Sequence, residues 1–97
     1  DLEAVAHFAR ERKIRTIIDN TWATPLFQKP LTKGIDVVVH SASKYLGGHS
    51  DCMGGAVIAS KAIIDRMFQQ EFLLLGATLS PYDAAQLIRG LRTLPMR

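Results

Sequence analysis

The amino-acid sequence predicts an α/β fold in which a mostly parallel sheet is flanked by helices. Helical and strand patterns follow one another in the order helix, strand, crossover, strand. The run Val37-Val38-Val39 contains no polar residue, which is typical of a strand that helices cover on both faces. About 16 residues, 20–35, separate the first two strands, and this is enough chain for a crossover with a short helix. These two strands are therefore expected to be parallel.

The chain is expected to begin with an amphipathic helix over residues 2–12. Its apolar side chains recur at helical spacing and are Leu2, Val5, Ala6 and Ala9. Residues 14–18 form a short segment rich in β-branched side chains, which predicts the first strand. That strand is expected to end before Asp19-Asn20-Thr21, because these residue types favour turns and helix caps.

The crossover is expected to contain a helix over residues 26–33 that ends before Gly34. The second strand is expected over residues 36–40. A polar loop with glycines follows at residues 41–51, and residues 54–59 predict a third strand.

The remaining residues predict two helices. The first is expected over residues 61–75. The second is expected to begin after Ser80, because Ser80 is a good N-cap, Pro81 suits the first helical turn and Asp83 occupies the capping-box position. This second helix should end at about Arg92. No repeat or linker within the 97 residues marks a domain boundary.

Composition and charge narrow the class of protein. Of the 97 residues, 47% are hydrophobic and 22% are charged, which predicts one small globular domain. The formal net charge is +3, and no aromatic residues interleave with the densest basic cluster, at residues 10–15, so no nucleic-acid partner is expected. No apolar run approaches the roughly 20 residues of a membrane span. Because the chain begins with Asp1, residues 1–97 are expected to be an internal segment of a longer protein whose remainder is not present.

The single cysteine and the histidines predict neither a disulfide nor a metal site. Cys52 has no partner within the chain, which favours a reducing compartment, and we expect a cytoplasmic protein. Four side chains of metal-ligand type lie close in sequence and are His40, His49, Asp51 and Cys52, but their spacing matches no recognised metal site.

Asp19 and the loop Ser41-Ala42-Ser43-Lys44 are the strongest candidates for a functional site. Each follows one of two neighbouring strands, whose carboxyl ends meet where ligands bind in parallel α/β sheets. The Ser41 and Ser43 hydroxyls, with loop N–H groups, are suited to a phosphate. Lys44 is then either a phosphate ligand or a Schiff-base nucleophile. A carboxylate facing a protonated pyridine nitrogen would complete a site for pyridoxal 5'-phosphate.

Longer motifs surround these residues. They are Asp19-Asn20-Thr21-Trp22-Ala23-Thr24-Pro25, Pro30-Leu31, Gly34-Ile35-Asp36, His40-Ser41-Ala42-Ser43-Lys44-Tyr45-Leu46-Gly47-Gly48-His49-Ser50-Asp51, Ser80-Pro81 and Arg89-Gly90-Leu91-Arg92-Thr93-Leu94. In these motifs nearly the whole chain resembles the cysteine and methionine metabolism family of pyridoxal-phosphate enzymes. The resemblance implies that the chain is part of the large cofactor-binding domain of an aspartate-aminotransferase-like enzyme of fold type I. It also implies a homotetramer that acts on a small amino-acid substrate.

The resemblance assigns roles to the candidate residues. It implies that Lys44 is the catalytic residue and binds the cofactor as a Schiff base, and that Asp19 pairs with the pyridine nitrogen. It implies that Ser41 and Ser43 bind the cofactor phosphate. Thr21 is expected near the cofactor ring. The family commonly has threonine where this chain has Ser43, and serine keeps the hydroxyl.

The motif Asp-Asn-Thr-Trp, which ends at Trp22, is more typical of bacterial cystathionine β-lyases than of their relatives, many of which carry phenylalanine there. We therefore expect β-elimination of cystathionine to homocysteine, pyruvate and ammonia. Cystathionine γ-synthase, cystathionine γ-lyase, methionine γ-lyase and homoserine sulfhydrylase chemistry remain alternatives, because these reactions use the same residues. A phosphate-binding module without catalysis is the alternative outside enzymes, although the Walker and Gly-x-Gly-x-x-Gly patterns are absent.

Overall fold

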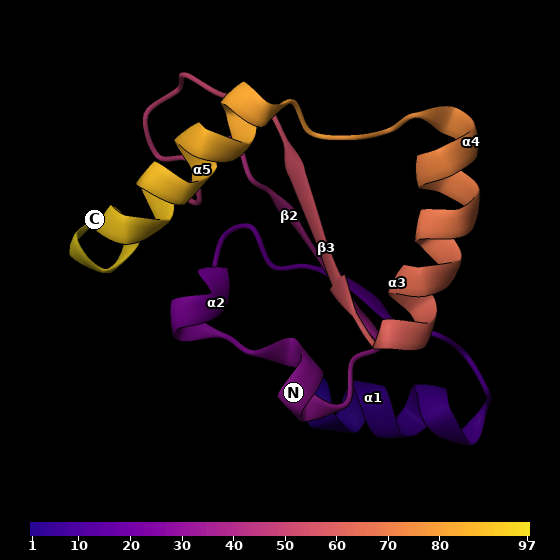
Figure 1. Cartoon of the computed structure of the whole chain (residues 1–97). Coiled ribbons are helices and arrows are strands. Elements are labelled where there is room, and N and C mark those ends of the chain that lie inside the picture. Colours follow the sequence, from indigo (N-terminus) through magenta and orange to yellow (C-terminus); the bar gives the residue numbers. More distant parts are fainter.

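The computed structural model describes residues 1–97 and has α/β architecture (Figure 1). The helices are α1 (Leu2–Glu11), α2 (Thr24–Phe27), α3 (Lys61–Met67), α4 (Leu73–Leu75) and α5 (Pro81–Thr93). The strands are β1 (Ile17–Asp19), β2 (Val37–Ser41) and β3 (Gly55–Ala59). Short 3₁₀ turns lie at Pro30–Lys33 and Leu94–Met96, and a π-helical turn lies at Phe68–Phe72. No helix is both long and apolar enough to cross a membrane.

The three strands form one mixed sheet in the order β1-β2-β3. Strands β1 and β2 are parallel, with Asp19 opposite Val39, as the crossover between them predicts. Strands β2 and β3 are antiparallel, with Ser41 opposite Gly55. The α/β class is therefore confirmed, but only one of the two strand pairs within this chain is parallel. The second pair is antiparallel because the connection at residues 42–54 contains no helix that would carry the chain back to the other end of the sheet.

The first strand begins three residues later than the pattern 14–18 predicts. Ile14 is still bound to the last turn of α1, since its N–H donates to the Ala9 carbonyl at 2.9 Å. Thr16 and Asp36 then form a side-chain clamp, in which the Thr16 N–H donates to Asp36 Oδ2 at 2.8 Å and the Asp36 N–H donates to Thr16 Oγ1 at 2.9 Å. These bonds lie just before the first paired residues of β1 and β2, Ile17 and Val37, and so help to fix the register of the two strands.

The crossover contains two short helical pieces instead of one helix over residues 26–33. Proline lacks an N–H and disfavours helical backbone at the residue before it, so Pro30 separates α2 from the following 3₁₀ turn. Gln28, after α2, is extended, with φ −143° and ψ 130°. The crossover ends at Gly34, as expected, and Gly34 has a φ of +88° that favours glycine.

The two C-terminal helical segments follow their sequence signals with one difference. The helix expected over residues 61–75 is divided by the π-helical turn, on which the rings of Phe68 and Phe72 stack with centroids 4.6 Å apart. Ser80 caps α5 as expected, because its Oγ accepts from the Asp83 N–H at 3.0 Å.

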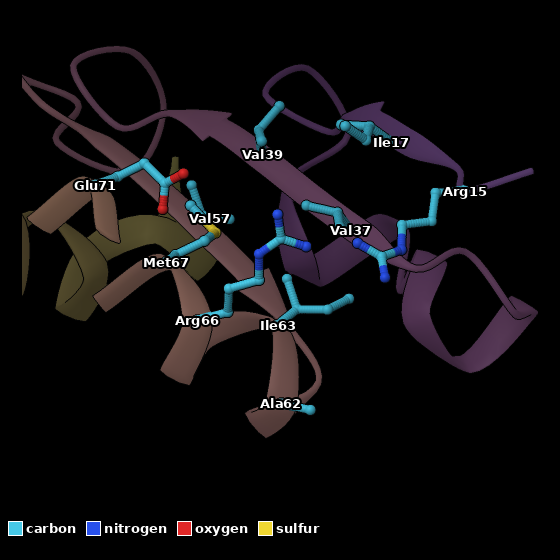
Figure 2. Close-up of a pocket in the computed structure, with 10 residues that line it drawn as sticks. All are labelled: Arg15, Ile17, Val37, Val39, Val57, Ala62, Ile63, Arg66, Met67 and Glu71. Atoms are coloured by element: carbon cyan, nitrogen blue, oxygen red, sulfur yellow. The ribbon is translucent and has the colours of Figure 1, made fainter. Parts of the chain in front are cut away.

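Helices lie on both faces of the sheet, but the core is small. The chain extends 42 × 36 × 16 Å, and 15 of its 97 residues are buried. A cavity of about 460 Å³ lies between α3 and the sheet face that carries Ile17, Val37, Val39 and Val57. Figure 2 shows the residues that line it. Ile17 on this face is 70% exposed. One apolar face of the sheet is thus only partly covered by this chain.

The 97-residue chain expressed alone is expected to self-associate and to unfold over a broad temperature range, without catalytic turnover. The reason is that apolar side chains such as Ile17 and Leu74, 70% and 78% exposed, have too few partners to be withdrawn from water. Light scattering and calorimetry would measure both properties. A monomer with a sharp transition and turnover would contradict this prediction.

Candidate functional site

Asp19, Thr21 and Ser41 lie together at the carboxyl ends of the parallel strands β1 and β2. Asp19 is the last residue of β1 and Ser41 is the last residue of β2. Thr21 connects them, because its N–H donates to Asp19 Oδ1 at 2.9 Å and its Oγ1 accepts from the Ser41 N–H at 2.7 Å. The two strand ends are therefore joined by one buried threonine, 9% exposed.

Asp19 carries a stabilised negative charge. Hydrogen bonding from the Thr21 side chain and from its backbone N–H lowers the pKa of Asp19 below its ordinary value. The charge of Lys44 lowers this pKa further, as does that of His40 when His40 is protonated, while desolvation opposes the shift. Asp19 is exposed, so its carboxylate is both ionised and accessible at neutral pH.

Lys44 lies in the loop that follows β2, and backbone hydrogen bonds within the loop hold it in place. Its N–H donates to the Ser41 carbonyl at 3.2 Å, and its carbonyl accepts from the Gly48 N–H at 2.7 Å. Ala42 is completely buried beneath the loop, whereas the Lys44 side chain is exposed. The loop thus has a fixed base from which the ε-ammonium group projects, near enough to Asp19 for its charge to affect the pKa of the carboxylate.

The two serines have different surroundings. Ser41 uses its backbone N–H to bind Thr21, and this bond leaves its hydroxyl unused. The Ser43 Oγ accepts from the Gly54 N–H at 2.9 Å and donates to the Gly54 carbonyl over a longer 3.4 Å. The longer bond is weak, so the Ser43 hydroxyl could redirect its proton to an anion while it keeps the stronger bond. Ser43 therefore joins the loop to the start of β3.

Asn20 is a structural residue of the site for which the sequence predicted no role of its own. It is 2% exposed, and its Nδ2 donates to the carbonyls of Thr24 and Gln28 at 3.2 and 3.0 Å. Its Oδ1 accepts from Gln28 Nε2 at 2.9 Å. A buried amide with these bonds fixes the corner between β1 and α2 and so orients Asp19. The polar run Asp19-Asn20-Thr21 after a strand was the available signal.

His40 lies on the opposite face of the sheet from Asp19. Strand residues alternate between faces, so His40 shares its face with Val38 and Ile58. His40 is 5% exposed, and its Nδ1 has no hydrogen-bond partner. Burial lowers the pKa of His40, against the raising effect of the Asp19 charge. The lowered pKa favours the neutral form of this buried imidazole. No cluster of three or more potential metal-ligand side chains occurs in the chain.

An ionised carboxylate and a lysine at the ends of neighbouring strands, with hydroxyls between them, are groups suited to an α/β domain that binds an anionic, electrophilic cofactor. The chain belongs to the family described as Cys/Met metabolism PLP-dependent enzymes, whose model matches residues 1–97. The enzymes of this family depend on pyridoxal phosphate.

Curated relatives with several reactions match the whole chain. An L-methionine gamma-lyase of Pseudomonas putida is 48% identical over 98 residues, which is 100% of this chain and 25% of the relative. A cystathionine gamma-synthase/O-acetylhomoserine (thiol)-lyase of Bacillus subtilis is 43% identical over 100% of this chain and 26% of its own length. A cystathionine beta-lyase of Coxiella burnetii is 43% identical over 100% and 25%. The chain therefore spans about a quarter of the length of these relatives.

Solved structures confirm the fold class. A cystathionine gamma-lyase from Lactobacillus plantarum complexed with L-serine has a TM-score of 0.91 at 42% identity, over 99% of this chain and 25% of the other. A cystathionine gamma synthase from Xanthomonas oryzae pv. oryzae, in complex with cystathionine, has a TM-score of 0.92 at 45% identity, over 100% and 25%. The mixed sheet and its flanking helices are thus part of a shared fold.

The side chains present fit pyridoxal phosphate by their chemistry. Asp19 is ionised and accessible, as a partner of a protonated ring nitrogen must be. Lys44 offers an exposed primary amine for the aldehyde. The Ser41 hydroxyl is free of the Thr21 bond, and Ser43 has a proton in a weak bond that a phosphate oxygen could take over.

Proposed function

We propose that the full-length protein is a pyridoxal-phosphate-dependent carbon–sulfur lyase that acts on a small sulfur-containing amino acid. The observation that carries this proposal is the placement of ionised Asp19 at the end of β1 and of exposed Lys44 in the loop after the neighbouring parallel strand β2. Thr21 joins the ends of the two strands by hydrogen bonds. We further propose a cytoplasmic homotetramer. The lone Cys52 supports the reducing compartment, and the family resemblance supports the assembly.

The proposed chemistry divides the work among few residues. Bound pyridoxal phosphate supplies an electron sink for the electron pair left on the substrate Cα when its proton is removed. Lys44 Nζ accepts that proton and would donate it to the thiolate that leaves when the carbon–sulfur bond breaks, and water then hydrolyses the remaining fragment to the keto acid and ammonia. Asp19 keeps its negative charge throughout and holds a proton on the ring nitrogen. Ser41 and Ser43 orient the phosphate, and Thr21 keeps the Asp19 carboxylate in place.

For the particular reaction we propose β-elimination of cystathionine to homocysteine, pyruvate and ammonia. Trp22 supports this proposal, because it follows the Asp19-Asn20-Thr21 corner and is 86% exposed, so its indole ring is available to a substrate or to a further part of the protein. The 43% identity to a cystathionine beta-lyase is consistent with it.

The second candidate is γ-elimination, which the 48% identity to an L-methionine gamma-lyase favours. This reaction would require Lys44 Nζ to move a further proton, at the substrate Cβ, before the sulfur departs from Cγ. Asp19, Ser41 and Ser43 would keep the same roles. The residues of this chain therefore serve both eliminations, and the product decides between them.

The full-length protein is expected to convert cystathionine mainly to pyruvate and homocysteine, as β-elimination requires. Chromatographic assay of both keto acids measures the ratio, with methionine as a second substrate. Dominant 2-oxobutyrate, or a requirement for an activated homoserine ester, would reject the β-lyase assignment in favour of γ-chemistry. The Lys44→Ala variant is the control for turnover without enzyme catalysis.

A further inference from the structure

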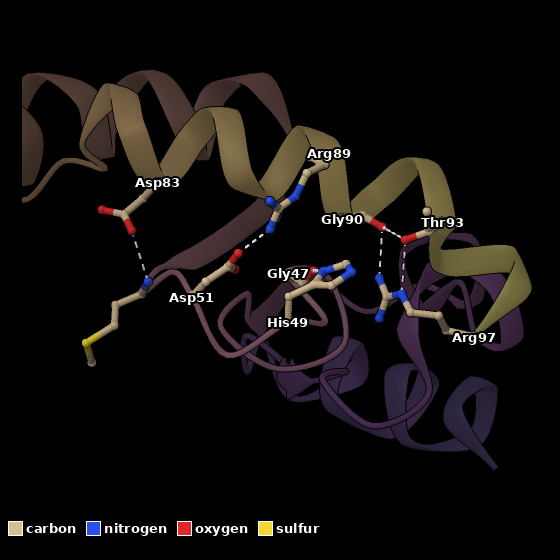
Figure 3. A network of polar contacts seen from close by, with 9 residues as sticks. Gly47, His49, Asp51, Asp83, Arg89, Gly90, Thr93 and Arg97 are labelled. Atoms are coloured by element: carbon tan, nitrogen blue, oxygen red, sulfur yellow. Dashed lines mark hydrogen bonds and ion pairs between the residues drawn. The ribbon is translucent and has the colours of Figure 1, made fainter.

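Helix α5 contacts the loop that carries Lys44 along most of the length of the helix (Figure 3). In its first turn, Asp83 Oδ1 accepts from the Met53 N–H at 3.1 Å. Further along, Arg89 forms an ion pair with Asp51. The end of the loop, at residues 51–53, is therefore bound to α5 through the charged side chains of Asp83 and Arg89 before β3 begins.

Arg97 binds the loop next to Lys44 itself. Its Nη1 donates to the Tyr45 carbonyl at 2.9 Å, and Tyr45 directly follows Lys44. Its Nη2 donates to the Gly90 carbonyl at 2.8 Å, and its Nε donates to Thr93 Oγ1 at 3.1 Å. Because the guanidinium is planar and its donors point in fixed directions, these bonds set the distance between α5 and the backbone after Lys44.

Gly90 lets the helix approach this loop closely. Gly90 is buried, and a Cβ at this position would overlap the carbonyl oxygens of Leu46 and Gly47. Gly47 in turn donates its N–H to the Ala42 carbonyl at 2.8 Å, on the other side of Lys44. The backbone of α5 is thus in direct contact with the turn from which the lysine projects.

We propose that Arg97 and Gly90 are positioning residues for Lys44. The proposal rests on the function proposed above, because it assigns a purpose to the contacts around the reacting amine. The Lys44 side chain is long and exposed, so the position of its Nζ depends on where the backbone of the loop is held. Residues 42–54 contain no helix or strand of their own, and α5 supplies the rigid support.

The test uses the full-length protein without cofactor, mixed with pyridoxal phosphate and trapped with borohydride. Mass spectrometry measures how fast label accumulates on Lys44, which requires no turnover. In Arg97→Met we expect labelling and kcat to fall roughly 10- to 100-fold with KM little changed, because a small displacement of a reacting group has an effect of this order. Arg97→Lys should recover part of the loss, since it restores a charged donor without the planar fork.

Arg92→Met is the matched control, because Arg92 is an exposed residue of the same helix and the same charge is removed. It should label at the wild-type rate. Gly90→Ala should slow labelling in the same direction as Arg97→Met. If Arg97→Met does not fold, Thr93→Val decides. It removes the acceptor of Arg97 Nε and, besides that, only the bond from Thr93 Oγ1 to the Gly90 carbonyl within the same helix. Slower labelling supports the proposal, and an unchanged rate overturns it.

The outcomes separate this inference from the proposed function. Unchanged labelling and kcat in folded Arg97→Met overturn the positioning role while wild-type labelling at Lys44 stands. A lower melting temperature with unchanged labelling also overturns it, because that result describes a merely structural contact. Absence of label on Lys44 in the wild-type protein overturns the proposed function itself.

Discussion

Replacing Lys44 with alanine in the full-length protein is expected to abolish turnover and the absorbance band of the lysine-bound cofactor. Alanine has no amine to bind the aldehyde and no group to accept the substrate proton, so both proposed roles are lost. The fold should persist, because the Lys44 side chain is exposed and the loop is held by backbone bonds such as that from the Gly48 N–H to the Lys44 carbonyl. Spectrophotometric titration with pyridoxal phosphate and a keto-acid assay measure the two losses.

Lys61→Ala is the matched control for this substitution. Lys61 begins α3, at the end of β3 remote from the Lys44 loop, and its ion pair with Asp65 is exposed. Such pairs contribute little to stability. The Lys61→Ala variant should keep both the absorbance band and normal turnover, whereas a band that persists in Lys44→Ala would reject Lys44 as the cofactor-binding lysine.

Asp19→Asn is expected to slow turnover at least about 100-fold while cofactor binding remains measurable. Asparagine keeps the oxygen that accepts from the Thr21 N–H at 2.9 Å, so the corner after β1 should be preserved. It loses the negative charge that favours a protonated ring nitrogen. That charge matters most when electrons move into the ring, so the loss should fall on kcat and less on the dissociation constant of pyridoxal phosphate.

The comparison variant is Asp36→Asn, which removes a carboxylate at the other end of the same pair of strands. The Thr16 hydrogen bonds lower the pKa of Asp36 too, so its charge is also stabilised by the fold. We expect Asp36→Asn to reduce stability with kcat nearly unchanged. Steady-state kinetics of both variants, with thermal melts alongside, test this separation, and near-normal kcat in Asp19→Asn would refute the role of Asp19.

Local sequence signals predicted the elements whose causes are local. The periodic apolar residues of α1 and the Ser80 cap of α5 predicted both helices, because spacing and capping depend on residues only a few positions apart. Val37-Val38-Val39 predicted β2 in the same way. The sequence also predicted the parallel pairing of β1 and β2, which brings Asp19 and the start of the Lys44 loop to one edge of the sheet.

Other features depended on residues distant in sequence. The start of β1 is set by Thr16 and Asp36, which are 20 residues apart and show no pattern that a local reading would detect. The antiparallel pairing of β3 followed from a loop without a helix.

The division of the crossover at Pro30, in contrast, has a local cause. Proline disfavours a helical residue before it, so the sequence already contained the signal that divides residues 26–33.

The sequence by itself determined the chemistry of the proposed site, because residue type decides which side chain can be an amine, a carboxylate or a hydroxyl, and these are the groups of the predicted residues Lys44, Asp19, Ser41 and Ser43. Only the tertiary structure decided how they are held. Thr21 joins the ends of two strands, and Arg97 reaches back to the Tyr45 carbonyl across 52 residues of sequence. Such contacts form only when the sheet and α5 are packed, since hydrogen bonds require their partners within about 3 Å, and sequence separation does not specify that distance.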